Sequence, residues 1–194
     1  MSRKTITNKE DIKKIKEYFI SQNNFTYDRH LLYFTLGINT PLKPDELSKV
    51  KWCDLVSNNH VQDFLEYNGY KFYLNNSCKR VIIQYIRKYV DIVNNEFVFE
   101  GIGHNQNNMT YAATNKMYRI MKDTLNLGFD FSNISLHKTF VYWQIYYCNS
   151  DYIKMTKLYY LTARNTEHRR NKDINSYAEY DINDNMIYIN DVNL

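Results

Sequence analysis

The side chains in this sequence that could act on a substrate are mostly basic. Arg164, His168, Arg169 and Arg170 gather in one short run that ends at Lys172. Arg and Lys bind phosphate groups through charge-assisted hydrogen bonds, so such a run can grip a nucleic acid backbone. Basic runs also occur as solvated faces, and the run by itself leaves both interpretations open.

Metal and cofactor chemistry is not expected from this sequence. His30, His60 and His104 lack the spacing of metal ligands, and the three cysteines lie far apart in the chain. The cysteine pattern predicts reduced thiols rather than a disulfide framework. We therefore expect no metal site and no cofactor.

Composition sets the class of protein. The chain has 194 residues, a hydrophobic content of 44% and a formal net charge of +4. This length suits one domain with a core, and the mild positive charge is compatible with a nucleic acid partner. No apolar run approaches membrane-spanning length, so we expect a cytoplasmic protein without a membrane partner.

The stretch from Gly37 to Asp54 carries an ordered set of polar and apolar residues. It resembles the first signature of the tyrosine recombinases, the phage integrase family, which reads Thr-Gly-Leu-Arg-x-x-Glu-Leu-x-x-Leu-x-Trp-x-Asp. The positions in register are Thr40, Leu42, Glu46, Leu47, Val50, Trp52 and Asp54. Lys43 stands where the family has its first catalytic arginine.

A second signature of that family, His-x-Leu-Arg-[His/Lys]-Thr-Phe, is similar to the segment from Ile134 to Phe140. Ile134 replaces the histidine and His137 replaces the second arginine. The remaining positions are kept as Leu136, Lys138, Thr139 and Phe140.

The third signature places a histidine nine residues before the tyrosine nucleophile. His168 and Tyr177 reproduce that spacing, although the family's usual gap after the second signature points nearer to Thr162. Tyr180 is a second candidate, and with 19 tyrosines a packing or surface role for either remains open. The family's hairpin lysine corresponds to Lys71, but the family places that lysine nearer the turn, so a solvated strand lysine explains Lys71 better.

The resemblance implies a reaction. In the family a tyrosine hydroxyl attacks a DNA phosphate, two arginines hold the phosphate oxygens, and a lysine protonates the leaving oxygen, without a metal. The corresponding catalytic positions here are Lys43, Lys71, His137, His168 and Tyr177. Both arginines are replaced, and neither lysine nor histidine has the planar fork that binds phosphate with two parallel bonds. We therefore expect a degenerate site.

The same resemblance predicts a phosphate-binding surface. Its expected residues are Lys43, Lys49, Lys51, Lys79, Arg80, His137, Lys138, Arg164, Arg169 and Arg170. The expected function is duplex DNA binding by a catalytically degenerate integrase-type protein of a phage or prophage, acting in a bacterial host cell as a regulator of lysogeny or transcription. The alternatives are an active recombinase that forms a 3′-phosphotyrosine and a protein-interaction module, and the partners could include other phage proteins or a second copy of the chain.

Hydrophobic periodicity predicts the first elements that must position these residues. Thr7 or Asn8 can cap a helix with Ile12, Ile15 and Phe19 on one face, and the Asn23-Asn24 pair breaks it. Further helices are expected over residues 27–36 and from 44 to about 52. Alternating residues in 61–67 and 70–74, separated by Asn68-Gly69, predict a β-hairpin.

The second half of the chain is expected to be helical. A helix follows residues 75–77, another contains Met117, Ile120, Met121 and Leu125 and is closed by Gly128, and further helices cover 140–147 and begin at 151. The predicted fold is α+β and mainly helical, an integrase-type catalytic domain with a small antiparallel hairpin sheet. We expect residues 1–180 to form one domain and the acidic segment 181–194 to form a C-terminal tail.

Overall fold

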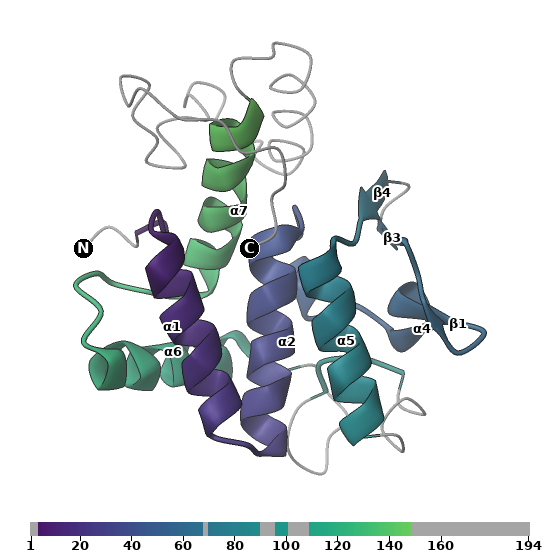
Figure 1. Ribbon diagram of the computed structural model, residues 1–194, viewed down its shortest axis with the longest axis horizontal. Helices are drawn as coiled ribbons and strands as arrows, with labels where there is room; N and C mark the ends of the chain where they lie inside the picture. The colour runs from purple at the N-terminus through teal and green to yellow at the C-terminus, as the bar shows by residue number, and fades with distance from the viewer. Residues whose placement is uncertain (1–3, 68–69, 90–95, 101–108, 149–194) are drawn as a thin grey trace.

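The computed structural model describes residues 4–67, 70–89, 96–100 and 109–148, and these form a mainly helical α+β fold (Figure 1). The elements follow in the order α1 (Lys9–Ser21), α2 (Phe25–Asn39), α3 (Pro44–Leu47), α4 (Trp52–Leu55), β1 (Val56–Ser57), β2 (His60–Val61), β3 (Phe64–Tyr67), β4 (Tyr70–Tyr73), α5 (Asn76–Lys88), α6 (Tyr111–Leu125) and α7 (Asn133–Cys148).

Helix α2 is the centre of the fold. Every residue from Arg29 to Asn39 is buried, because α2 packs against α1, α3, α5 and α7. In Figure 1, α1 and α5 lie on either side of it. From Leu31 to Ile38 the α2 sequence is apolar on nearly all sides, and such a helix is stable only inside a protein.

The outer helices bury one face each, as their periodicity predicts. In α1 the buried residues are Ile12, Ile15 and Phe19, and in α5 they are Cys78, Ile82 and Tyr85. Both helices begin at an asparagine whose side chain accepts a backbone N–H of the first turn, Asn8 for α1 and Asn75 for α5. The predicted cap at Asn8 and the predicted apolar face of α1 are confirmed.

The predicted hairpin is confirmed as β3 and β4, which pair antiparallel in a register that sets Tyr67 opposite Tyr70. A second hairpin, β1 and β2, pairs Ser57 with His60 and was not predicted. Asn58 and Asn59 connect its strands, and both have positive φ values of 50° and 62°. Two such residues in succession form the type I′ turn that matches strand twist, and asparagine tolerates this conformation.

The helix expected from 44 to about 52 begins at Pro44 as predicted, but its expected end is wrong, because α3 ends at Leu47 and α4 begins at Trp52. After a turn at residues 48–49, the backbone pairs with a distant segment. The Trp52 N–H donates to the Glu96 carbonyl, and the Val98 N–H donates to the Val50 carbonyl. A pairing across more than forty residues leaves no local signal in the sequence.

The expected closure of α6 at Gly128 is also wrong, because α6 ends at Leu125 and its C-cap is Asn126, which adopts the left-handed conformation with φ 49°. The apolar face of α6 also differs from the expected one. Met121 is buried as expected, but Ile120 is exposed, and Tyr118 is buried although it was not expected to be. The helix expected from residue 151 lies outside the described residues.

His30 on α2 gives the fold a pH dependence. Its ring is buried beside the Phe19 and Tyr118 rings, and burial, followed by the nearby Arg29 charge, lowers the pKa of His30 to about 4. The unfolded chain therefore binds a proton at a higher pH than the folded chain, so stability is complete above the unfolded pKa and falls as the pH drops toward 4.

We predict that the wild-type protein loses roughly 2–3 kcal/mol more unfolding free energy than His30→Gln when the pH falls from 7 to 4.5. Urea unfolding at the two pH values measures this difference. His60→Gln is the matched control, because His60 is exposed. Equal losses in the wild type and in His30→Gln would contradict the assignment.

Candidate nucleic-acid interface

The residues of the first signature that match the family have structural roles in this chain. The Glu46 carboxylate accepts the Lys43 N–H at 2.9 Å, and the Asp54 carboxylate accepts the Lys51 N–H at 2.8 Å. Each carboxylate thus satisfies a backbone donor at the start of a short helix, α3 or α4. The Thr40 hydroxyl donates to the Leu36 carbonyl at 2.8 Å.

The apolar positions of the same signature form part of the core. Leu42, Leu47, Val50 and Trp52 are all buried. The Trp52 ring stacks on the Tyr85 ring of α5, with 5.8 Å between the ring centroids. These residues therefore fix the path of the chain from the end of α2 to the start of α3. Lys43 is the residue immediately before α3.

The second signature lies in α7 and is also tied into the fold. The Thr139 hydroxyl accepts the Ile6 N–H at 3.0 Å and donates to the Ser135 carbonyl at 2.7 Å. The Trp143 indole N–H donates to the Ile6 carbonyl at 3.0 Å. These bonds hold the N-terminal segment against α7. The Thr139 hydroxyl group uses its donor and one acceptor position in them.

Gly37 brings the two signatures together. A Cβ placed on Gly37 would lie 2.7 Å from Leu136 Cδ1 and 3.2 Å from Leu47 Cδ2. Leu136 belongs to α7 and Leu47 to α3, so both helices meet α2 where it has no side chain. The elements that carry Lys43 and His137 are therefore neighbours, although about a hundred positions separate them in sequence.

The predicted phosphate ligands differ in exposure. Lys43 and Lys138 are each partly exposed, whereas the His137 side chain is only 1% exposed. Both lysines therefore present part of their side chains to solvent. A phosphate contact by His137 would require its surroundings to open.

Ion pairs reduce the charge available at other predicted DNA contacts. Lys51 contacts Glu96 at 2.6 Å and Lys79 contacts Asp63 at 2.5 Å, and these hydrogen bonds raise the pKa of each lysine. Lys49 and Arg80 are exposed, and no ion pair between described residues involves either of them.

The predicted hairpin lysine also has an acidic neighbour. Lys71 lies opposite Glu66 in the β3–β4 hairpin, and the two charged groups are 3.8 Å apart on exposed side chains. A pair this exposed contributes little to stability.

The remaining predicted residues lie outside the described part of the chain. They are Arg164, His168, Arg169, Arg170 and Tyr177, together with the alternative nucleophile Tyr180. The third signature and the C-terminal basic run therefore stay predictions.

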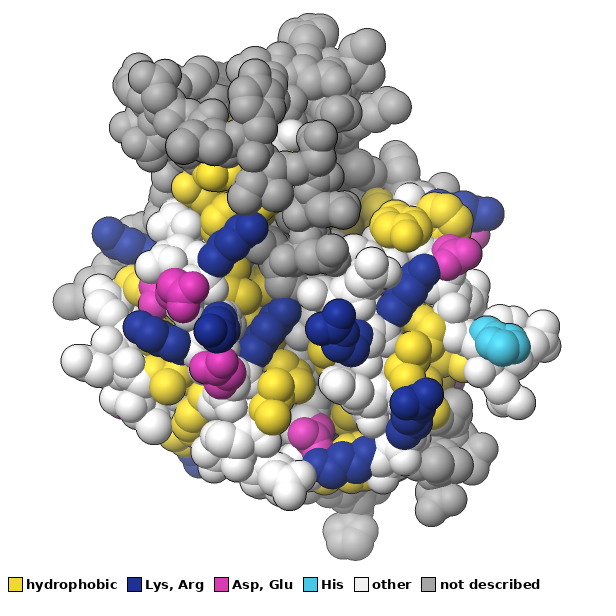
Figure 2. Space-filling view, viewed as in Figure 1, with side chains coloured by type: hydrophobic (Ala, Val, Ile, Leu, Met, Phe, Trp, Pro, Cys, Tyr) yellow, Lys and Arg dark blue, Asp and Glu magenta, His cyan; other side chains and the backbone are white. Residues whose placement is uncertain are grey.

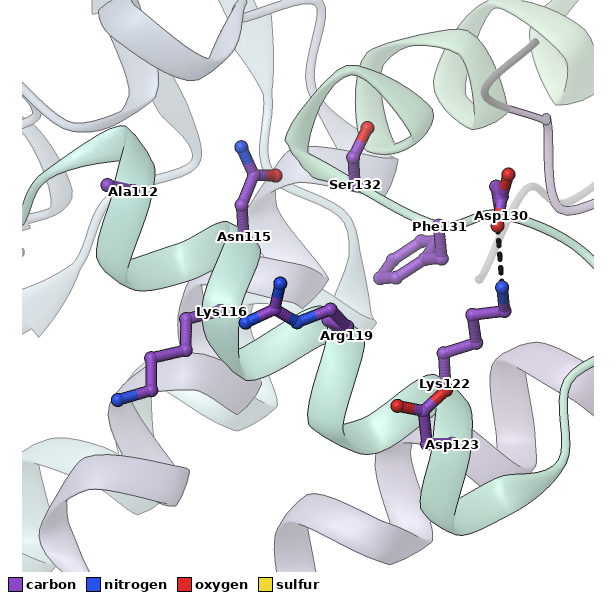
Figure 3. Close-up of a pocket in the computed structure, with 9 residues that line it drawn as sticks. All are labelled: Ala112, Asn115, Lys116, Arg119, Lys122, Asp123, Asp130, Phe131 and Ser132. Carbon is purple, nitrogen blue, oxygen red and sulfur yellow. Dashed lines mark hydrogen bonds and ion pairs between the residues drawn. The ribbon is translucent and has the colours of Figure 1, made fainter. Parts of the chain in front are cut away.

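A hollow of about 500 Å³ beside α6 contains basic residues that the sequence analysis did not single out (Figure 3). Lys116, Arg119 and Lys122 line it at three-residue spacing on one face of the helix. Lys122 bonds to Asp130 at 2.5 Å and lowers the pKa of that carboxyl group. Asp123 also lines the hollow, so the hollow contains both positive and negative side chains. The three-residue spacing of the basic residues was the signal in the sequence that could have revealed this hollow.

No model of a known protein family matches this sequence, and no curated protein matches it. Among the described residues, none of the helices is both long enough and apolar enough to cross a membrane.

The contact at Gly37 predicts a specific sensitivity to substitution. Gly37→Val should lower the free energy of unfolding by roughly 1–3 kcal/mol, because the added side chain must displace Leu136 or Leu47. Chemical denaturation measures this change. Gly128→Ala is the control and should have a far smaller effect, since a Cβ there meets no atom within 4 Å. A Gly37→Val protein as stable as the wild type would show that α3 and α7 do not meet there.

Proposed function

We propose that the protein binds duplex DNA with an integrase-type fold and does not carry out strand transfer. The observation that supports this proposal most directly is the meeting of α3 and α7 at Gly37. It makes neighbours of the two segments that resemble recombinase signatures, and each segment presents a partly exposed lysine, Lys43 or Lys138. Two cations on neighbouring elements suit the phosphate backbone of DNA.

The side chains at the altered positions argue against strand transfer. Lys43 offers a point charge where the family uses a guanidinium fork, and the buried His137 stands at the other arginine position. Removal of one preorganised donor to a developing oxyanion typically costs about 10²–10³ in rate. With both positions altered, the proposed role is binding, and regulation of phage lysogeny or transcription is the function that such binding would serve.

We predict that a nicked suicide DNA duplex traps no covalent adduct with this protein. The reason is that neither altered position supplies bidentate contacts to the phosphate undergoing attack. Denaturing gel electrophoresis of the protein after incubation with labelled DNA measures adduct formation. An adduct that forms with the wild type and disappears in Tyr177→Phe would contradict the proposal and would establish an active recombinase.

We predict that duplex binding weakens steeply as salt concentration rises, because each neutralised phosphate contributes about −0.9 to the log–log slope. The double variant Lys43→Glu with Lys138→Glu should weaken binding and reduce the magnitude of the slope by about 2. Fluorescence anisotropy with a labelled duplex measures both quantities, and circular dichroism checks the fold.

A control with the same change in charge tests whether the effect is local. Lys14→Glu with Lys116→Glu alters exposed lysines of α1 and α6, helices that carry neither signature. This control should keep most of the wild-type slope. Equal effects of the two double variants would assign the binding to net charge, and no salt-sensitive binding by the wild type would contradict the proposed function.

A further inference from the structure

A second group of basic side chains lies on α1 and α5, which carry neither signature. Figure 2 shows Lys and Arg side chains over this face, with Asp and Glu side chains between some of them. On α1, Lys9, Lys13, Lys16 and Ile20 follow one another at spacings of four, three and four residues, so they form one stripe beside the buried face.

A hollow of about 220 Å³ lies beside this stripe, and Ile20 of α1, Leu31 of α2 and Val81 of α5 line it together with Asp28, Gln84 and Lys88. Lys16 precedes Ile20 by one helical turn, and Arg80 directly precedes Val81. Each helix therefore carries a cation within about one turn of a residue that lines the hollow. The groove is defined as this hollow together with the adjoining surface at Lys13, Lys16 and Arg80.

Lys16 lies close enough to α5 for the charges there to act on it. It is partly buried, and burial lowers the pKa of Lys16, with Arg80 lowering it further. The neighbouring Cys78 thiol could balance the charge only as a thiolate, but burial raises the pKa of Cys78 to about 12, so this group is neutral at ordinary pH. Two cations thus approach each other without a compensating charge from Cys78.

No acid in the described part of the chain neutralises the cations of this groove. Ion pairs between described residues do not include Lys13, Lys16 or Arg80. The carboxylate at the end of the groove, Asp28, already accepts bonds from Lys88 Nζ and the Tyr89 hydroxyl, each at 2.6 Å.

Lys9 is excluded from this set because its Nζ lies 5.5 Å from the centroids of both the Trp143 and Tyr147 rings, toward α7. Lys13, Lys16 and Arg80 are the cations that remain open to an external anion.

We propose that Lys13, Lys16 and Arg80 form a second contact surface for the phosphate backbone of duplex DNA. This inference rests on the proposed function and adds α1 to the elements that bind DNA. Duplex DNA carries one negative charge for about every 1.7 Å of its axis, so it offers several phosphates to a set of three cations. An acidic protein fits less well, because the central residues of protein interfaces are depleted in lysine.

The test compares two triple variants that lose the same charge. The groove variant carries Lys13→Gln, Lys16→Gln and Arg80→Gln, and the control carries Lys14→Gln, Lys116→Gln and Arg119→Gln. Anisotropy of a labelled duplex at several salt concentrations should show the magnitude of the log–log slope falling by about 2–3 for the groove variant and by less than about 1 for the control.

A double variant covers the case in which replacing the partly buried Lys16 disturbs folding. Lys13→Gln with Arg80→Gln changes only exposed side chains and should reduce the magnitude of the slope by about 2. Near-ultraviolet circular dichroism of each variant verifies that the folded state is retained.

Three results would overturn the inference. If the wild type binds DNA and the groove and control variants have equal slopes, this second surface is wrong while the proposed function stands. If the groove variant loses binding to polyglutamate but keeps its binding to DNA, the partner is an acidic protein. If the wild type binds no duplex, the proposed function and this inference fail together.

Discussion

The fold depends on how closely α3 and α7 approach α2 at Gly37. Any side chain at this position would overlap Leu136, whose Cδ1 lies 2.7 Å from the place of a Cβ. Glycine in a helix costs about 1 kcal/mol relative to alanine, so it is retained here at some expense to helix stability. The close approach offsets that cost with buried contacts among Gly37, Leu47 and Leu136, and it decides which residues share one surface.

The residues of the two segments that resemble recombinase signatures have structural roles in this chain. Glu46 and Asp54 each satisfy a backbone N–H, Trp52 stacks on Tyr85, and Thr139 accepts the Ile6 N–H. Loss of any of these would leave a donor without its partner or a cavity in the core, at a cost of about 1–3 kcal/mol or more. The bond from position 43 to Glu46 comes from the Lys43 backbone N–H, so a change of side chain at that position keeps this bond.

Asparagine residues form many helix caps and turns of this fold, and some of these could be predicted from the sequence whereas others could not. The chain has only 5 Gly and 2 Pro, and asparagine supplies many of its helix starts and turns. The cap at Asn8 and the hairpin turn at Asn68-Gly69 follow familiar patterns and were predicted. The left-handed residues Asn58, Asn59 and Asn126 were not predicted, because asparagine adopts that conformation less often than glycine and signals it weakly.

Long-range contacts account for the other differences. The break between α3 and α4 follows from backbone pairing with residues 96–98, and the neutralised charges of Lys51 and Lys79 depend on distant acids. The adjacency of α3 and α7 could be anticipated only through a resemblance that joins the two segments. The basic stripe of α1 was visible in the spacing of its lysines, but its nearness to Arg80 required the packing of α1 and α5 around α2.

Hydrogen–deuterium exchange of the whole chain, with and without duplex DNA, tests the central claim most directly. The proposed interface predicts DNA-dependent protection concentrated at the start of α3, around residues 41–47, and in the first turns of α7, around residues 134–140. These two segments should respond together, since they meet at Gly37. Protection confined to other segments, or no protection at DNA concentrations that saturate binding, would contradict the claim that the two signature segments form a DNA-binding surface.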